Sequence, residues 1–255
     1  MTTPSPRRPA PTLDVERDIA ARLGAGARTI VGLDEVGRGA LAGPVVMGAC
    51  AVSLGAGDRH ETTLPDGVRD SKLLTPRRRE ALIAPIRAAA LATAVGAAEP
   101  EEIDEVGIVD ALTRAALRAL DGLGLPVDAV LLDGSADVLS AALADRPAAP
   151  RVITRVKADR DCASVAAASV LAKVHRDGVM TALHEQAPAY AWAANKGYGS
   201  AAHREAIARH GVHPQHRRSW NLRGGRTGGN TQSSAAAAGV LWEGPWPPES
   251  QKEPR

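Results

Sequence analysis

Aromatic residues are almost absent from this chain of 255 residues. It contains no phenylalanine, two tyrosines and four tryptophans, whereas 44% of its residues are hydrophobic. A core must therefore be built mainly from alanine, valine, leucine and isoleucine. The length and the apolar content suit one sizeable domain or two small ones.

Cysteines and membrane-like segments are equally scarce. Cys50 and Cys162 lie far apart beside small or apolar residues, so they lack metal-ligand spacing and are typical of buried thiols in a reducing compartment. No apolar run is long enough to cross a membrane, and the N-terminus has no hydrophobic signal region. We therefore expect a cytoplasmic protein without membrane association.

Charge of one sign is also lacking, because 31 basic residues face 29 acidic ones and leave a net charge of +2. That excess is too small to identify a nucleic-acid partner by itself. Residues 1–12 are rich in proline, and residues 223–255 are rich in glycine, serine, alanine and proline. We expect a disordered leader and a disordered tail around a folded body at residues 13–222.

Within this body, strands come first and then alternate with helices, which predicts an α/β fold with a mixed sheet. Pro85 predicts a kink or a break in the second helix. Helical and loop pieces are expected from residue 188 onward. The expected helices cover residues 13–23, 76–92, 103–123 and 162–186, and the expected strands cover residues 29–33, 44–52, 91–98, 129–132 and 151–156.

Four acidic residues stand at the ends or on the faces of these elements: Asp34, Glu35, Asp133 and Asp177. Strand ends gather where α/β proteins bind ligands, so the carboxylates can converge. Asp177 shares one helical stripe with Ser169 and Lys173, at four-residue steps. Like charges repel unless a hard cation such as Mg²⁺ or Mn²⁺ neutralises them. Two such ions about 3.5–4 Å apart form the clamp used in phosphodiester hydrolysis.

Other interpretations stay open for each acid alone, because a single carboxylate is also typical of a solvated charge or a helix cap, and Asp133-Gly134 is a turn signal. Adjacent strand residues point to opposite faces. Asp34 and Glu35 can therefore share a metal centre only if their strand ends or bulges there, which Gly37 favours.

Several short motifs are spread over residues 29–220. They are GLDEVGRG at residues 32–39, AGPVV at 42–46, DSKL at 70–73, LLDG at 131–134, AAASVLAKVHRD at 166–177, NKGYG at 195–199 and HRRSW at 216–220. These motifs resemble, in the same order, those of the ribonuclease HII family. Val36 stands where alanine is common in that family, and Trp220 where phenylalanine is usual.

The resemblance implies a ribonuclease H-like fold, a mixed sheet flanked by helices with a C-terminal helical extension at about residues 188–222. It implies cleavage of the RNA strand in RNA–DNA hybrids and incision at ribonucleotides embedded in duplex DNA. A metal-activated water would attack phosphorus and leave 3′-hydroxyl and 5′-phosphate ends. The ligands of two Mg²⁺ or Mn²⁺ ions would be Asp34, Glu35, Asp133 and Asp177.

By the same resemblance, Gly37, Arg38 and Gly39 would sense the ribonucleotide, and Tyr198 would pack on its sugar. The 2′-hydroxyl distinguishes RNA from DNA, and glycines let backbone groups approach it closely. Arg38 suits either a phosphate or an ion pair with Glu35. Further candidates for phosphate contacts are Lys72, Lys157, Ser169, Lys173 and Lys196.

The C-terminal part leaves more than one interpretation open. His203, His210, His213 and His216 lack a nearby cysteine, so phosphate contacts are favoured over a zinc site. The basic pair at residues 217–218 would grip a duplex backbone or keep a helix soluble. We expect a monomer, and the apolar residues 239–242 with Trp246 would dock a replication protein or reflect composition alone.

Three other function classes remain as alternatives. A non-catalytic hybrid-binding module would lack at least one acid, and none is missing. A hydrolase of small phosphate esters would not need Tyr198 or the basic C-terminal stretch. A Holliday-junction nuclease has a similar acidic cluster and differs in its preference for branched DNA.

Overall fold

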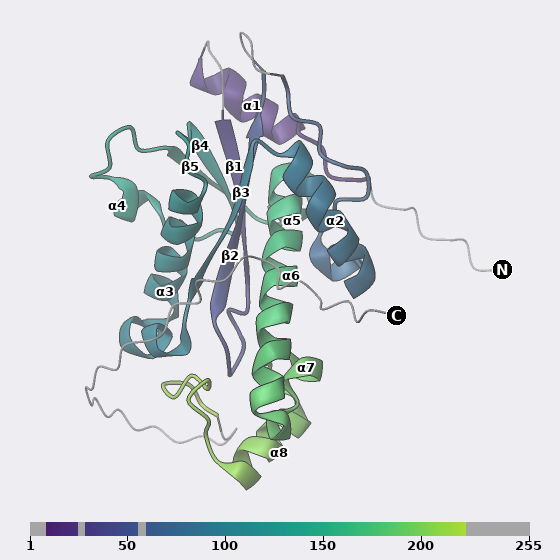
Figure 1. The fold of residues 1–255 in the computed structure, drawn as a ribbon. Helices are drawn as coiled ribbons and strands as arrows, with labels where there is room; N and C mark the ends of the chain where they lie inside the picture. The colour runs from purple at the N-terminus through teal and green to yellow at the C-terminus, as the bar shows by residue number, and fades with distance from the viewer. Residues whose placement is uncertain (1–8, 25–28, 56–59, 223–255) are drawn as a thin grey trace, which may run out of the picture. The chain divides into compact units, whose positions relative to one another are not determined.

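The structure of the chain, a computed structural model, describes residues 9–24, 29–55 and 60–222 (Figure 1). The expected tail, including its docking residues 239–242 and Trp246, lies outside the described residues. Thr12, which the sequence places in the leader, forms a β-bridge with Cys162. The ordered body therefore includes this end of the expected leader.

All of the strands and longer helices expected from the sequence are present, with shifted bounds. The strands are β1 Thr29–Val36, β2 Val45–Ser53, β3 Ala92–Ala98, β4 Ala129–Asp133 and β5 Arg151–Arg155. The helices are α1 Asp14–Leu23, α2 Pro76–Ala89, α3 Pro100–Gly122, α4 Ser140–Leu143, α5 Ala158–Asp161, α6 Ala163–Gln186, α7 Trp192–Asn195 and α8 Ala201–His210, with 3₁₀ turns η1 Ser71–Leu73 and η2 Pro188–Tyr190.

The strands form one mixed sheet in the order β3-β2-β1-β4-β5. β1, β2 and β3 pair antiparallel, and the expected hairpin of β1 with β2 is confirmed. β4 lies parallel to β1 on its other side, and β5 continues parallel to β4. The carboxyl ends of β1, β4 and β5 therefore meet at one edge of the sheet, where α/β proteins gather their ligands.

The two faces of the sheet are covered by different helices (Figure 1). Val31 and Leu33 of β1 pack in the cluster that contains α3, whereas Ile30 packs in the cluster that contains α6. This alternation is the two-residue period of a strand. A Cβ on Gly32 would lie 2.3 Å from the backbone of Ser164, so the lack of a side chain there lets α6 approach the sheet closely.

Two local expectations are wrong. β1 runs through Asp34 and Glu35 to Val36 in unbroken register with β2, without the expected end or bulge at the acids. α2 continues without a break through Pro85 to Ala89, and Ile86, directly after the proline, is fully buried in the core. A kink that the sequence did not predict lies in α3, where Gly107 has a φ of 81°.

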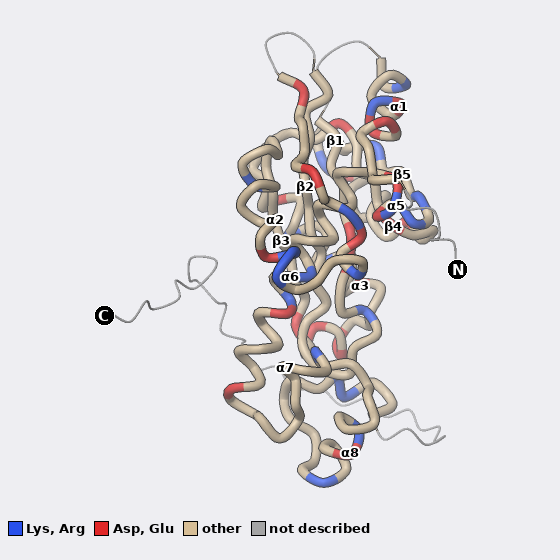
Figure 2. The backbone as a smooth tube through the Cα atoms, turned by 90° about the vertical axis from the view of Figure 1, so that its right-hand side faces the viewer, with Lys and Arg blue, Asp and Glu red and all other residues tan. Residues whose placement is uncertain are grey.

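The C-terminal helical extension is confirmed and forms a third apolar cluster with part of α6. Tyr190 and Trp192 pack there with Met180 and Ile207. All aromatic residues in the part of the chain that the structure describes belong to this extension. Basic and acidic residues are interspersed along the described backbone, in keeping with the small net charge (Figure 2). None of the described helices could cross a membrane.

Candidate active site

Asp34 and Asp133 lie side by side at the edge where the parallel strands end. The register of β1 and β4 pairs Leu33 with Leu132, so the next position on each strand carries an acid. Asp34 lies on the face of Ile30 that packs against α6. Only 8% of Asp34 is exposed. The sheet therefore buries this carboxylate beside a second one.

A third acid, Asp159, joins them, although its role was not predicted from the sequence. It lies in α5, the short helix that follows β5, and is buried. Burial, followed by the charges of Asp70 and Asp133, raises the pKa of Asp159 to about 6. A signal for Asp159 was present in the sequence, because it follows the end of β5 by four residues. β5 runs parallel to β4, which carries Asp133, so both strands end at the same edge of the sheet.

Asp133 is anchored by the same short helix. One of its carboxylate oxygens accepts a hydrogen bond of 2.7 Å from the backbone N–H of Ala158. The contact fixes α5 against the end of β4 and thereby brings Asp159 to the cluster. The acids at this edge come from three separate elements, β1, β4 and α5.

The cluster is electrostatically strained. Burial raises the pKa of Asp34 to about 7, a hydrogen bond from Ser169 opposes the rise, and the charges of Asp133, Glu35 and Asp159 add to it. A carboxyl group with this pKa is partly protonated at neutral pH. A bound cation would reverse that balance, because it favours the charged form.

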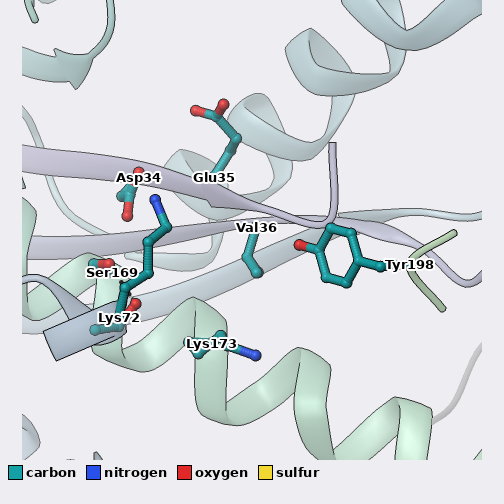
Figure 3. Close-up of a pocket in the computed structure, with 8 residues that line it drawn as sticks. Asp34, Glu35, Val36, Lys72, Ser169, Lys173 and Tyr198 are labelled. Carbon is teal, nitrogen blue, oxygen red and sulfur yellow. Dashed lines mark hydrogen bonds between the residues drawn. The ribbon is translucent and has the colours of Figure 1, made fainter. Parts of the chain in front are cut away.

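Glu35 approaches the cluster from the other face of the sheet. Figure 3 shows its side chain on the opposite side of β1 from Asp34. Burial raises the pKa of Glu35, Arg38 lowers it and Asp133 raises it. The guanidinium of Arg38 lies 3.8 Å from the carboxylate of Glu35, which fits the ion-pair interpretation. A phosphate contact from Arg38, which is half exposed, stays a prediction.

Asp177 is the sequence-selected acid that the structure does not bring to this cluster. Its carboxylate pairs with the amine of Lys173 and, at 3.5 Å, with Arg79. The shared helical stripe is present, but Asp177 lies eight residues beyond Ser169, about 12 Å along the helix axis. Ser169 is the residue of the stripe that reaches Asp34, so Asp177 is too far along α6.

Asp34 and Glu35 line a pocket together with several other residues that the sequence predicts to bind the substrate. The amine of Lys72 points toward Asp34, and Tyr198 stands at the far end, with 38% of its surface exposed (Figure 3). The residues lining the pocket are Asp34, Glu35, Val36, Ser71, Lys72, Ser169, Lys173 and Tyr198.

Two selected lysines lie outside this lining. Lys157 occupies an exposed left-handed turn just before α5. The amine of Lys196 donates a 3.0 Å hydrogen bond to the hydroxyl of Thr181 on α6. Neither lines the pocket, and a phosphate contact from either remains a prediction.

The glycine loop, residues 37–43, follows Val36 of the pocket lining and has two positions that require glycine. Gly37 has a φ of +87°, and a Cβ there would lie 2.1 Å from the guanidinium nitrogen Nε of Arg176. Gly43 has a φ of +77° and is packed as closely, with a Cβ site 2.3 Å from a neighbouring side chain. Gly39 is exposed, with open space where its Cβ would be. The loop therefore exposes backbone at its tip and is closely packed at its base.

The base of the loop is held by two buried arginines that the sequence analysis did not recognise. Arg176 and Arg217 have no exposed surface. Arg217 donates hydrogen bonds to the carbonyls of Gly37, Arg38 and Gly43. Both interpretations of Arg217, gripping a duplex or solubilising a helix, are therefore wrong.

The expected phosphate contacts are also wrong for His203 and His216, because both rings are fully buried. Their Nε2 atoms lie 3.1 Å apart, and His203 also accepts a hydrogen bond from the indole of Trp192. His203 Nδ1 faces the carbonyl of Tyr198, and His216 Nδ1 accepts from the N–H of His213. These partners fix two neutral tautomers.

The donor set suits a hard divalent cation. Carboxylate oxygens are the ligands that Mg²⁺ and Mn²⁺ prefer, and Asp34, Asp133 and Asp159 supply them from a buried edge. Within residues 9–24, 29–55 and 60–222, no three acidic, histidine or cysteine side chains already form a closed ligand group.

A mixed sheet of this order, with clustered carboxylates beside a glycine loop that is exposed at its tip, fits a metal-dependent nuclease with a ribonuclease H-like fold. The family model described as Ribonuclease HII matches residues 31–223. The chain belongs to the ribonuclease HII family and is an endoribonuclease of RNA–DNA hybrids.

Individual relatives agree with this assignment. A ribonuclease HII of Streptomyces griseus is 46% identical over 213 residues, which cover 82% of this chain and 84% of the relative. The crystal structure of ribonuclease H2 from Pyrococcus horikoshii has a TM-score of 0.63 and 29% identity, and covers 76% of this chain and 95% of its own.

A third relative was solved with a partner protein. In the PCNA:RNase HII complex from Archaeoglobus fulgidus, the matching chain has a TM-score of 0.59 and 30% identity. The match covers 77% of this chain and 98% of that one.

Proposed function

We propose that this enzyme also incises duplex DNA at a single embedded ribonucleotide, by hydrolysis at two divalent ions. The observation that carries the proposal is the position of the buried Asp34 among other acids, three residues before a glycine loop whose tip at Gly39 is exposed. Asp34, Asp133 and Asp159 would hold the ions from one face of the sheet and Glu35 from the other. In this proposal Asp159 replaces Asp177 as the fourth acidic ligand.

Bound at this edge, Mg²⁺ or Mn²⁺ would lower the pKa of a water and stabilise the departing 3′-oxygen. The protein's own residues orient the substrate. Lys72, at the pocket wall beside Asp34, would contact a phosphate next to the scissile bond. Cleavage on the 5′ side of the ribonucleotide would leave a 3′-hydroxyl and a 5′-phosphate.

Recognition of the ribonucleotide would come from the opposite end of the pocket. The exposed backbone of Gly39 would approach the 2′-hydroxyl without a side chain in the way. Tyr198, exposed at the far end of the pocket, would pack its ring on the sugar. The two contacts together would test for the hydroxyl and hold the sugar in place.

A cleavage assay tests this proposal. Duplex DNA with one central ribonucleotide is incubated with the full chain, with and without Mg²⁺ or Mn²⁺, beside all-DNA and all-RNA duplexes. We expect one metal-dependent cut on the 5′ side of the ribonucleotide and no cut in either control. Cleavage of RNA–DNA hybrids without cleavage of this duplex would refute the proposal.

Docking of a replication protein concerns the tail, which the structure does not describe, and it stays a prediction. The PCNA complex of the Archaeoglobus relative supports looking for such a contact. The monomeric state and the cytoplasmic location also stay predictions.

A further inference from the structure

Two guanidinium groups are buried directly behind the glycine loop. Arg176 comes from α6 and Arg217 from the segment after α8, and neither has exposed surface. Burial and the neighbouring charge of Arg176 lower the pKa of Arg217 to about 9, so it is still charged at neutral pH. Burying two neighbouring cations costs free energy that apolar side chains at the same positions would not. Packing alone therefore does not explain why arginines stand there.

Arg217 spans the whole glycine loop through its hydrogen bonds. Its Nη2 lies 2.7 Å from the carbonyl oxygen of Gly37 and 3.0 Å from that of Gly43, and its Nη1 lies 2.9 Å from that of Arg38. Its backbone N–H donates to the carbonyl of Leu41 at 2.9 Å. One residue thus turns four loop carbonyls inward.

Arg176 joins the loop to the segment that carries Tyr198. Its Nη2 donates to the carbonyl of Ala42 at 3.0 Å, and its Nη1 donates to the carbonyl of Lys196 at 2.8 Å. The carbon Cζ of its guanidinium also lies 5.4 Å from the centre of the Tyr198 ring, within cation–π range. The loop and the tyrosine are therefore fastened to the same side chain.

We propose that Arg176 and Arg217 are positioning residues that hold the glycine loop and Tyr198 as one rigid surface for sensing a ribonucleotide. This inference rests on the proposed function, because it assigns the two arginines to the parts that would contact the ribonucleotide. Inward carbonyls fix the peptide planes of the loop. Its exposed backbone is then oriented before the chemical step, which avoids an ordering cost in reaching the transition state.

Geometry matters more than charge in this arrangement. A lysine would keep the positive charge, but its ammonium is a single point and cannot replace a planar fork that bonds carbonyls in several directions. Arg217→Lys and Arg176→Lys therefore separate position from charge. Arg118→Lys is the matched control, since Arg118 also bonds a carbonyl, that of Ala97, but lies on α3 away from the loop.

The experiment measures kcat and KM on two substrates, duplex DNA with one ribonucleotide and a hybrid with a continuous RNA strand. We expect a misplaced loop to lower kcat on the single ribonucleotide by about 10- to 100-fold. KM should change little. The hybrid is expected to lose less, because its many 2′-hydroxyls allow other registers. Arg118→Lys is expected to leave both substrates unchanged.

Hydrogen exchange of the loop amides, measured without substrate, provides an independent readout. Arg217→Lys is expected to speed exchange at residues 37–43, while Arg118→Lys leaves it unchanged. If lysine prevents folding, Trp220→Leu removes the ring that lies 5.0 Å from the Arg217 guanidinium and keeps both arginines. Trp220→Leu is then expected to speed exchange at residues 37–43 as well, by a smaller factor.

The outcomes distinguish the two proposals. A wild-type chain that does not cut at a single ribonucleotide would sink the proposed function, and the exchange rates would still decide whether the arginines order the loop. A wild-type chain that cuts, with lysine variants that keep its kcat and its substrate preference, would overturn the inference. Unchanged exchange in those variants would overturn it as well.

Discussion

The acidic edge of the sheet and the C-terminal extension both bury ionisable groups, but they treat them in opposite ways. At the sheet edge, burial raises the pKa of Asp34 to about 7, and the charges of the other carboxylates add to the rise. In the extension, Arg217 and His216 are buried with hydrogen-bond partners for their polar atoms. The protein itself supplies the partners of Arg217 and His216, whereas the acids of the edge would be completed by bound cations.

This difference separates reacting groups from positioning groups. A carboxylate cluster that repels itself binds a cation more tightly than a satisfied one, because the cation relieves the repulsion. A guanidinium that bonds only main-chain carbonyls has a fixed geometry and little left to offer a substrate. We therefore expect mutations at the edge to remove chemistry and mutations in the extension to loosen geometry or stability.

The strongest test of this contrast is Asp34→Asn. We expect cleavage to fall by at least about 10³-fold, because the amide removes a metal-binding oxygen and its charge. Binding of an RNA–DNA hybrid, measured by fluorescence anisotropy, should remain, since the fold and the phosphate contacts persist. A variant with full Mg²⁺-dependent turnover would remove Asp34 from the chemistry.

A comparison of Asp159→Asn with Asp177→Asn tests which of the two acids belongs to the acidic cluster. Asp159 is part of the acidic cluster, so its loss is expected to lower kcat by about 10²-fold. Asp177 acts only through its ion pairs with Lys173 and Arg79, so a smaller loss is expected. Turnover is measured with saturating Mg²⁺, and Asp161→Asn, an exposed neighbour paired with Arg155, is the control. Greater damage from Asp177→Asn would restore the assignment made from the sequence.

The same pair of acids shows how far the sequence could predict the site. The alternation of strands and helices was enough to predict the sheet, and apolar runs ending in Asp34 and Asp133 were enough to predict its acidic edge. The helical stripe through Asp177 was also correct as geometry. Periodicity, however, does not give the position of a helix along its axis, which decides whether Asp177 or Asp159 reaches the cluster.

Residues in the extension were harder to predict for a different reason. A basic pair such as Arg217 and Arg218 is typical of a surface, and only tertiary contacts reveal that Arg217 is enclosed by carbonyls from residues 37–43. The histidines show the same difficulty, because His203 and His216 bond each other across thirteen positions of sequence. Contacts of this kind leave no local pattern.

The buried histidines make the extension sensitive to acid. Burial lowers the pKa of His203 and lowers that of His216 to about 4, with His203 and His213 adding to the latter. Their neutral forms thus stabilise the fold fully above the ordinary pKa of about 6.5, and the contribution is lost as the pH falls from there toward about 4.

We expect the free energy of unfolding in urea to drop by about 2 kcal/mol between pH 7.5 and pH 5 from His216 alone. His216→Leu should flatten that dependence, and His60→Gln, at an exposed position, should keep it. An unchanged slope in His216→Leu would show that the pair does not titrate with folding.

The smallest effect is expected where the two regions meet, at Tyr198. The ring lines the pocket of the acidic edge, while its backbone carbonyl accepts from His203 of the extension. Tyr198→Ala removes the stacking surface and is expected to lower kcat/KM on a single embedded ribonucleotide by about tenfold, the effect of about 1.4 kcal/mol. Tyr198→Phe keeps the ring and the backbone contact, so it should retain nearly full activity. If both variants lost activity equally, the hydroxyl rather than the ring face would contact the substrate, and Tyr198 would belong with the reacting groups.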